Sequence, residues 1–223
     1  FLYNKAKYVL VASQSTYDDL KKNFNISSPP LTLVPNGIDF DNSSMPTAKR
    51  RDIDIVYGGR LTQQKQPFVA IDLLLDIIGR YPSATVHIYG DGHLREKILK
   101  VITTHRLLTQ VKYFSPTNDF GSVLRRTKIL VSTSLYEGLS ITGMEAMKHG
   151  AVNACLDAPG SRDLVIRDKT GLLEPSIAAL ADRVVTVLKN PALLTSLRRN
   201  AYTYGKKHFS QVNERILVDM LLE

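Results

Sequence analysis

Short apolar runs that are rich in β-branched residues alternate along this chain with stretches of helical periodicity. Residues 67–82, 93–108 and 177–190 carry apolar side chains at helical spacing. The apolar runs, which predict strands, lie at residues 8–12, 31–34, 53–59, 84–90, 111–114, 128–134 and 151–156. Continuous apolar strands separated by amphipathic helices are typical of a parallel sheet that helices cover on both faces. The sequence therefore predicts an α/β fold, a Rossmann-like doubly wound parallel sheet.

The organisation of the chain changes at the polar, turn-forming stretch 41–52, which has the composition of an interdomain linker. Residues 1–40 contain one strand, one helix beginning after Ser15 or Thr16, and a second strand, which is too little apolar surface for a domain. We therefore expect them to be the end of a preceding domain that this chain lacks. The other segments are the Rossmann-like domain at 53–190 and residues 191–223, with two helices predicted at 192–209 and 210–223.

Composition excludes several classes of protein. With 223 residues, 43% of them hydrophobic and 22% charged, the chain is long enough for one domain and a fragment of another. No stretch approaches the roughly 20 apolar residues that span a bilayer, and Lys5 and Lys7 interrupt the only apolar opening, so we expect a cytosolic protein. The single cysteine, Cys155, excludes an internal disulfide framework and lies in an apolar run, which predicts an inert core thiol.

The net charge of +8 raises the question of an anionic partner. The basic residues are scattered, with no aromatic-interleaved basic segment and no helix-turn-helix or zinc signature, so we expect solvated surface and no binding of nucleic acid. Peripheral attachment to an acidic membrane surface stays open as an alternative. The basic groups stand at 49–51, 125–126, 198–199 and 206–208.

One candidate cluster follows the first strand of the main domain, in "YGGRLTQQKQ". Gly58 and Gly59 allow a tight turn, and Arg60 and Lys65 supply two cations. A guanidinium can hold phosphate oxygens in pairs while an ammonium acts as a mobile point charge, so the arrangement suits a diphosphate. Two surface cations on a loop are the alternative.

The next two strands also end in loops that could meet a ligand, because ligands of open α/β sheets bind outside the carboxyl ends of the strands. In "YGDGHLREK", Gly90 and Gly92 would let the backbone approach closely, and the following helix start would favour an anion. The third glycine of a dinucleotide fingerprint is absent, which counts against NAD or FAD. In "YFSPTND", which contains Ser115, backbone groups could face a base, although an ordinary connection fits equally well.

The fourth cluster is "YEGLSITGMEAMKHG", residues 136–150. Gly138 allows close approach, and Ser140 can cap a helix that ends at Gly150. Glu137 lies just ahead of this helix, and Glu145 lies within it, where an unpaired carboxylate is costly to bury. An ionised carboxylate accepts two hydrogen bonds and so suits a vicinal diol such as that of ribose. Two solvated surface acids are the alternative.

The ordered motifs "VPNGID", "GGRLTQQKQ", "IYGDGHLREKI", "VKYFSP", "VSTSLYEGLSITGMEAMKHG" and "TGLLEP" resemble the C-terminal, donor-binding half of a retaining GT-B glycosyltransferase of family 4. The family's paired glutamates, with seven residues between them, match Glu137 and Glu145. The resemblance implies that Glu145 accepts hydrogen bonds from the nucleotide ribose and that Glu137 contacts the transferred sugar. It also implies that Arg60 and Lys65 hold the diphosphate and stabilise the departing nucleoside diphosphate.

The resemblance further implies that backbone amides at the helix start contact the phosphate or sugar, and that the loop around Ser115 receives the base. It implies a UDP- or GDP-sugar as substrate, no divalent metal and no other cofactor. The candidate site residues are Gly59, Arg60, Lys65, Ser115, Glu137, Gly138, Leu139, Ser140, Ile141 and Glu145, with catalytic roles for Glu137, Arg60 and Lys65.

The family's second domain would bind the acceptor, which could be a sugar, a lipid-linked sugar or a protein. The final helices would cross back toward that domain, and polysaccharide assembly at the inner face of the membrane is an expected setting. Without the acceptor-binding domain, we expect this chain to bind a donor but not to transfer sugar. Some positions depart from the family pattern: Val152 replaces a common proline, and Asn153 replaces an apolar residue. A nucleotide-sugar epimerase or hydrolase of the same architecture, and a non-catalytic scaffold domain, are the competing interpretations.

Overall fold

The main domain is a parallel sheet of six strands in the part of the chain that the computed structural model describes, residues 6–23, 30–40, 45–46, 51–104, 109–210, 218–219 and 222. All neighbouring strands pair in parallel, which confirms the predicted fold class. The strands, in spatial order, are β5 (Val111–Phe114), β4 (Val86–Tyr89), β3 (Ile53–Gly58), β6 (Thr127–Ser132), β7 (Val152–Leu156) and β8 (Gly171–Glu174).

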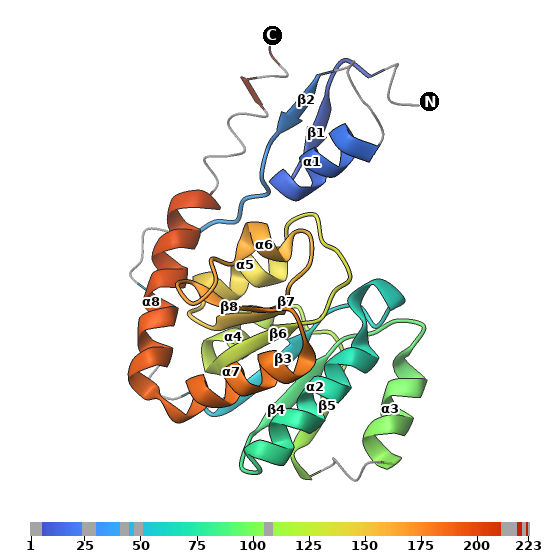
Figure 1. Cartoon of the computed structure of the whole chain (residues 1–223), viewed down its shortest axis with the longest axis vertical. Coiled ribbons are helices and arrows are strands. Elements are labelled where there is room, and N and C mark those ends of the chain that lie inside the picture. Colours follow the sequence, from blue (N-terminus) through green and yellow to red (C-terminus); the bar gives the residue numbers. More distant parts are fainter. Residues whose placement is uncertain are drawn as a thin grey trace.

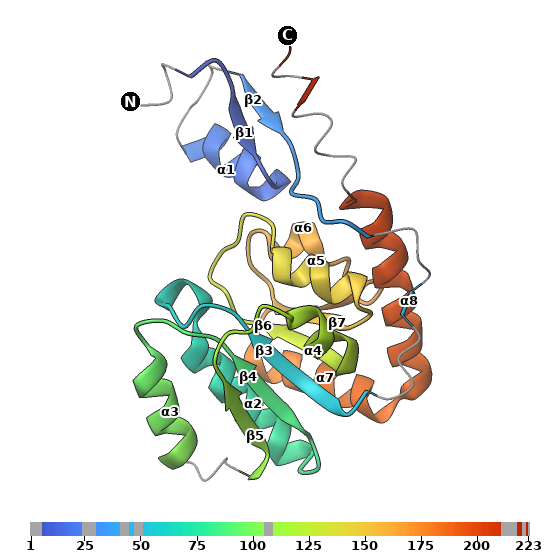
Figure 2. The ribbon, with the colours of Figure 1, turned by 180° about the vertical axis from the view of Figure 1, so that it is seen from behind.

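Helices cover both faces of this sheet (Figures 1 and 2). On one face, α2 (Pro67–Arg80), α3 (Arg95–Thr104) and α7 (Ile177–Lys189) bury apolar side chains against the strands in the largest core cluster. On the other face lie α4 (Phe120–Arg126), α5 (Ile141–Lys148) and the short α6 (Ser161–Leu164). The long helix α8 (Pro191–His208) runs along the side of the molecule and contributes to both layers.

Local sequence signals explain where these helices begin. Pro67 stands at the first turn of α2, where its missing N–H costs nothing. The side chains of Ser140, Ser176 and Asn190 cap α5, α7 and α8, because each accepts a hydrogen bond from a first-turn amide. The predicted starts of these helices are therefore confirmed to within a residue.

A separate two-stranded parallel sheet precedes the main domain. It pairs β1 (Val9–Val11) with β2 (Leu31–Leu33), and α1 (Gln14–Asn23) connects them. The helix begins earlier than the predicted start after Ser15 or Thr16, because the hydroxyl of Ser13 accepts a hydrogen bond from Thr16 N at 3.3 Å and so caps it. We call residues 6–40 the N-terminal unit; the predicted domain boundaries stay a prediction.

The end of α8 packs against the last residues of this unit. Phe40 and Tyr202 meet edge to face with ring centroids 5.9 Å apart, and Ile38 N donates to the carbonyl of Phe209 at 2.9 Å. Gly205 faces the Phe40 ring so closely that a Cβ there would lie 2.6 Å from it. The described end of α8 thus lies beside the N-terminal unit, as Figure 1 shows.

Among the described residues, four short elements were not predicted, namely η2 (Gln63–Lys65), α4, α6 and β8. The three helical ones have seven residues or fewer, so periodicity gives little signal, and β8, "GLLE", has no β-branched or aromatic residue. The strand predicted at 84–90 corresponds to β4, which is shorter. The helix predicted at 93–108 corresponds to α3, and residues 105–108 of that prediction lie outside the described residues. Most of the helix predicted at 210–223 also lies outside them.

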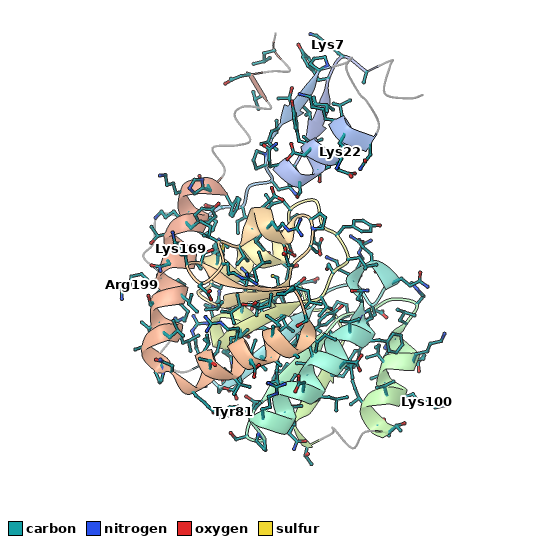
Figure 3. The ribbon with its side chains drawn as sticks, viewed as in Figure 1. Lys7, Lys22, Tyr81, Lys100, Lys169 and Arg199 are labelled. Carbon is teal, nitrogen blue, oxygen red and sulfur yellow. The ribbon has the colours of Figure 1, made fainter. Side chains whose placement is uncertain are left out.

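The remaining sequence expectations concern the surface and the thiol. Figure 3 shows Lys22, Lys100 and Arg199 on separate parts of the molecule, which agrees with scattered basic charge rather than one basic face. Cys155 is buried and unpaired, and burial raises the pKa of its thiol to about 12, as expected for an inert core residue. No helix among the described residues is long and apolar enough to cross a membrane.

Candidate functional site

The loops after β3, β4 and β5 meet α5 around one cavity of about 510 Å³, which we call the outer cavity. Its lining includes Gly59, Arg60, Tyr89, Phe120, Thr142 and Glu145, together with residues 116–118. The carboxyl ends of parallel strands lie at one edge of the sheet, so residues far apart in the sequence converge there. The sequence predicted this edge as the ligand site.

Two glycines allow the β3–α2 and β4–α3 loops to touch. A Cβ on Gly90 would lie 2.1 Å from the carbonyl oxygen of Gly59, and Gly92 adopts a φ of 151°, which favours glycine. Leu61 N donates to the carbonyl of Asp91 at 2.8 Å. Gly90 and Gly92 thus let two loop backbones meet at one wall of the outer cavity. Close approach of this backbone to a ligand stays a prediction.

A second, much smaller space of about 20 Å³ lies beside the outer cavity, and we call it the inner cavity. Gly58 and Thr142 line both cavities, so the two cavities are adjacent at the sheet edge. The inner cavity is also lined by Lys65, Ser134, Glu137, Ser140 and Asn153. Its volume is close to that of a single water molecule in a protein interior.

An ion pair between Lys65 and Glu137 narrows the inner cavity. The ammonium of Lys65 donates to Oε1 of Glu137, and the Ser134 hydroxyl donates to the same oxygen at 2.6 Å. Only 20% of the Lys65 side chain and 11% of the Glu137 side chain are exposed. The two side chains thus form a largely buried ion pair in the wall of this space.

The backbone around Lys65 is held by buried hydroxyls. Tyr57 Oη and Thr133 Oγ1 donate to the carbonyl of Lys65 at 3.3 and 3.1 Å. The next residue, Gln66, has a φ of 47° between the 3₁₀ turn η2 (Gln63–Lys65) and α2. Burial, followed by the charge of Glu137, raises the pKa of Tyr57 well above its ordinary range, so this hydroxyl stays a hydrogen-bond donor.

The N-terminus of α5 points toward both cavities. Ser140 caps it by accepting from Gly143 N at 3.2 Å, and the first turn carries partial positive charge. The buried amide of Asn153 donates to the carbonyl of Gly143 at 2.9 Å. A Cβ on Gly143 would lie 2.3 Å from a Leu164 methyl, so a larger residue here would require the Leu164 side chain to move. Asn153, one of the departures from the family pattern, thus ties β7 to the start of α5.

The two glutamates face different parts of the site. Glu137 lines the inner cavity, whereas Glu145, which is partly buried one turn into α5, lines the outer cavity. Burial raises the pKa of Glu145, and the nearby Lys148 opposes that effect. The seven intervening residues therefore place the two carboxylates in two adjacent cavities.

The other predicted site residues lie in different surroundings. Arg60 is exposed at the outer cavity, with its guanidinium 3.3 Å from Gln64 Oε1. Gly138 lines a neighbouring groove of about 850 Å³ beside α1. Leu139 is buried, Ile141 is 53% exposed at the helix start, and Ser115 is not among the residues lining the outer cavity, which its neighbours 116–118 line.

Sequence reasoning missed the aromatic floor of the outer cavity. Tyr89 stacks on Phe114 with ring centroids 4.7 Å apart and meets Phe120 edge to face at 5.5 Å. Tyr89 ends a strand directly before a glycine, and this position was an available signal. Phe120 belongs to the unpredicted helix α4, so its role could not be inferred. Within the described residues, no group of three or more His, Cys, Asp or Glu side chains is arranged to hold a metal ion.

Comparison with known proteins identifies similar chains. A model of the family described as glycosyl transferases group 1 matches residues 40–208. The glycogen synthase of Mycobacterium tuberculosis is 26% identical over 200 residues, which cover 86% of this chain and 48% of that protein. The poly(ribitol-phosphate) alpha-N-acetylglucosaminyltransferase of Staphylococcus aureus is 24% identical over 223 residues, covering 99% of this chain and 43% of that protein. The chain therefore spans less than half the length of these two relatives.

Solved structures show the same fold. A mutant of TarM from S. aureus, in complex with fondaparinux, alpha-GlcNAc-glycerol and UDP, superposes with a TM-score of 0.88 at 23% identity, covering 98% of this chain and 44% of that one. HepE from Anabaena, in complex with UDP and glucose, superposes with a TM-score of 0.85 at 21% identity, covering 100% of this chain and 65% of that one. At these identities the likeness establishes the fold, which is that of GT-B glycosyltransferase domains.

Proposed function

The chain belongs to the glycosyl transferases group 1 family, and on that premise we propose that it is the donor-binding half of a hexosyltransferase that uses a nucleotide sugar. We assign it to family 4 of the GT-B enzymes and infer transfer with retention of anomeric configuration. The observation that carries the proposal is the pair of adjacent cavities with one glutamate in each and the first turn of α5 lining both.

The outer cavity would hold the nucleoside. Glu145 presents a carboxylate that can accept both hydroxyls of a ribose diol. Tyr89 and Phe120 offer an aromatic floor to a flat base, and residues 116–118 offer polar groups to its edge. In this proposal Ser115 would contact the base through its backbone and not through its side chain. The partly buried Glu145 is costly to ionise without such partners, which is the physical reason to assign it a ligand.

The diphosphate would lie at the start of α5. Helix N-termini bind anions through free amides and partial positive charge, here from residues 139–141. Arg60 and Lys65 add two cations from the facing loop, and in this proposal they supply the positive charge that a divalent metal supplies in other transferases. As the bond to the sugar breaks, these groups stabilise the departing nucleoside diphosphate. A chelator is therefore expected to leave donor binding unchanged.

The sugar would contact Glu137, and the ion pair links this contact to the diphosphate. In the structure, the Lys65 ammonium donates to the Glu137 carboxylate. A bound diphosphate offers Lys65 a stronger anion, which releases Glu137 to accept hydrogen bonds from sugar hydroxyls. The proposal therefore makes sugar recognition depend on prior engagement of the diphosphate, with Gly138 leaving room beside Glu137.

The names of the similar structures support a uridine nucleotide as the donor, because UDP is bound to TarM and to HepE. The acceptor would bind through a further domain of a longer protein, as a sugar, a lipid-linked sugar or a protein. We therefore propose that this chain binds donor but does not transfer sugar by itself. Its cytosolic location and any attachment to a membrane stay predictions.

A thermal-shift and calorimetry series tests the proposal. UDP, GDP, ADP, UDP-glucose and UDP-N-acetylglucosamine would be added to the chain, and ligand at 100 times its dissociation constant adds about 2.7 kcal/mol to stability. We expect one base to stabilise the chain and Glu145→Ala to abolish that gain. No stabilisation by any nucleotide, or equal stabilisation of wild type and Glu145→Ala, would contradict the proposed site.

A further inference from the structure

The N-terminal unit contacts the main domain directly beside the loop that carries Glu137. The N-terminus of α1 lies against the segment 157–163, which leads from β7 into α6 (Figure 1). The same segment forms one side of the groove that Gly138 lines. A contact here can therefore transmit the position of α1 to the candidate sugar site.

Ser15 makes this contact through three hydrogen bonds. Its backbone N donates to Oδ1 of Asp163 at 3.2 Å, and its hydroxyl donates to Oδ2 of the same carboxylate. The hydroxyl oxygen also accepts a hydrogen bond from Gly160 N at 2.8 Å. Asp163 thus caps α1 from another part of the chain, 148 residues away in sequence.

The segment that holds Ser15 also holds Glu137. Glu137 N donates to the carbonyl of Pro159 at 3.0 Å. Gly160 has a φ of 79°, and a Cβ there would lie 2.3 Å from the carbonyl oxygen of Glu137, so the two backbones are in direct contact. Gly160 therefore contacts Glu137 and donates to Ser15 at the same time.

A second contact from the N-terminal unit reaches the far side of the same loop. Nδ2 of Asn36 donates to the carbonyl of Leu139 at 3.3 Å. The backbone of residues 137–139 is therefore held on one side through Ser15 and Gly160 and on the other by Asn36. Glu145, which would bind the ribose, and Arg60, which would bind the diphosphate, line the outer cavity and make neither of these contacts.

We infer that Ser15 and Asp163 are positioning residues for Glu137, and that docking of the N-terminal unit through them fixes the carboxylate that receives the donor sugar. This inference rests on the proposed function for the sugar contact. The coupling itself is a property of the fold and can be measured without ligand. Losing the contact should loosen residues 135–139 and weaken recognition of the sugar while leaving nucleoside binding intact.

Hydrogen exchange of the unliganded chain decides whether the coupling exists. We expect Ser15→Ala and Asp163→Asn to speed exchange of the peptide 135–139 by about fivefold or more, with β4 unchanged, because local opening depends on such contacts. Ser15→Thr keeps the hydroxyl and should restore slow exchange. Ser176→Ala is the matched control, since Ser176 caps α7 through Ala179 N at 3.3 Å and lies outside the site. Equal exchange at 135–139 in Ser15→Ala and Ser176→Ala would overturn the inference.

Calorimetry with UDP and UDP-glucose then separates positioning from general loss of structure. Ser15→Ala should leave the dissociation constant of UDP within about twofold and reduce the extra affinity that glucose adds by about fivefold, with rescue in Ser15→Thr. Equal weakening of UDP and UDP-glucose would show a merely structural role and overturn the inference. If wild type binds neither ligand, the proposed function fails, while the exchange experiment still decides the coupling.

Discussion

Replacing Glu137 with glutamine removes one charge from the ion pair with Lys65 and leaves the shape of the side chain almost unchanged. The Ser134 hydroxyl can still donate to the new amide oxygen. Lys65 loses its anionic partner and becomes free to meet a diphosphate. The change should therefore act in opposite directions on stability and on nucleotide binding.

The size of both effects follows from the burial of the pair. With 20% and 11% of the two side chains exposed, the pair resembles a charged hydrogen bond in a partly dry site, worth about 1.5–3 kcal/mol. A chain of this length loses about 2–4 °C of Tm per kcal/mol, so Glu137→Gln should lower the Tm by roughly 3–12 °C. A diphosphate no longer has to break the pair. Recovering even about 1 kcal/mol of that energy tightens UDP binding by about fivefold.

Calorimetry with UDP and a thermal melt of the same samples measure both quantities. Ser134→Ala is the control, because it removes a hydrogen bond to Glu137 and keeps the ion pair. It should lower the Tm slightly and leave UDP affinity unchanged. Weaker UDP binding in Glu137→Gln, or unchanged Tm and affinity together, would refute the claim that Lys65 is shared between Glu137 and the diphosphate.

Three further changes, one of them with a matched control, test separate parts of the structure. Asn153→Val removes the side-chain amide that donates to the Gly143 carbonyl and should lower the free energy of urea unfolding by about 0.5–1.5 kcal/mol and weaken UDP binding; an unchanged midpoint would contradict this. Burial raises the pKa of Glu145, so the folded state loses stability as pH rises through that pKa and the carboxyl group ionises. Glu145→Gln should therefore raise the Tm at about pH 8 but not at about pH 4, and it should weaken UDP binding. Gly90→Ala, whose Cβ would lie 2.1 Å from the carbonyl of Gly59, should lower the Tm, whereas Gly79→Ala, with open space around it, should raise stability by about 0.5–1 kcal/mol.

Local sequence pattern was sufficient for most of the fold. For example, β5 has its predicted bounds, and α2 ends two residues before its predicted end. Strand β8, "GLLE", escaped prediction because it has no β-branched or aromatic residue, and because its buried Glu174 is paired with Arg167, which a strand pattern does not reveal. Short elements that depend on such pairing cannot be inferred from alternation alone.

The candidate site was only partly predictable for a related reason. Strand ends predicted that Arg60, Lys65, Glu137 and Glu145 lie on one edge of the sheet, and in the structure all four line the two adjacent cavities there. The ion pair between Lys65 and Glu137 joins residues 72 positions apart, so no local pattern could specify it. The contact of Ser15 with Asp163 spans 148 positions and is invisible to periodicity for the same reason. Roles assigned by resemblance stay predictions until a donor is bound.

A crystal structure of the chain with UDP would show directly whether Lys65 leaves Glu137 for the diphosphate. We expect the ribose hydroxyls on Glu145 and the phosphates at the start of α5 beside Arg60 and Lys65. We also expect the Lys65 ammonium to have moved from Glu137 to a phosphate oxygen. UDP bound elsewhere, or bound in the outer cavity with its phosphates away from α5 and the ion pair intact, would contradict these expectations.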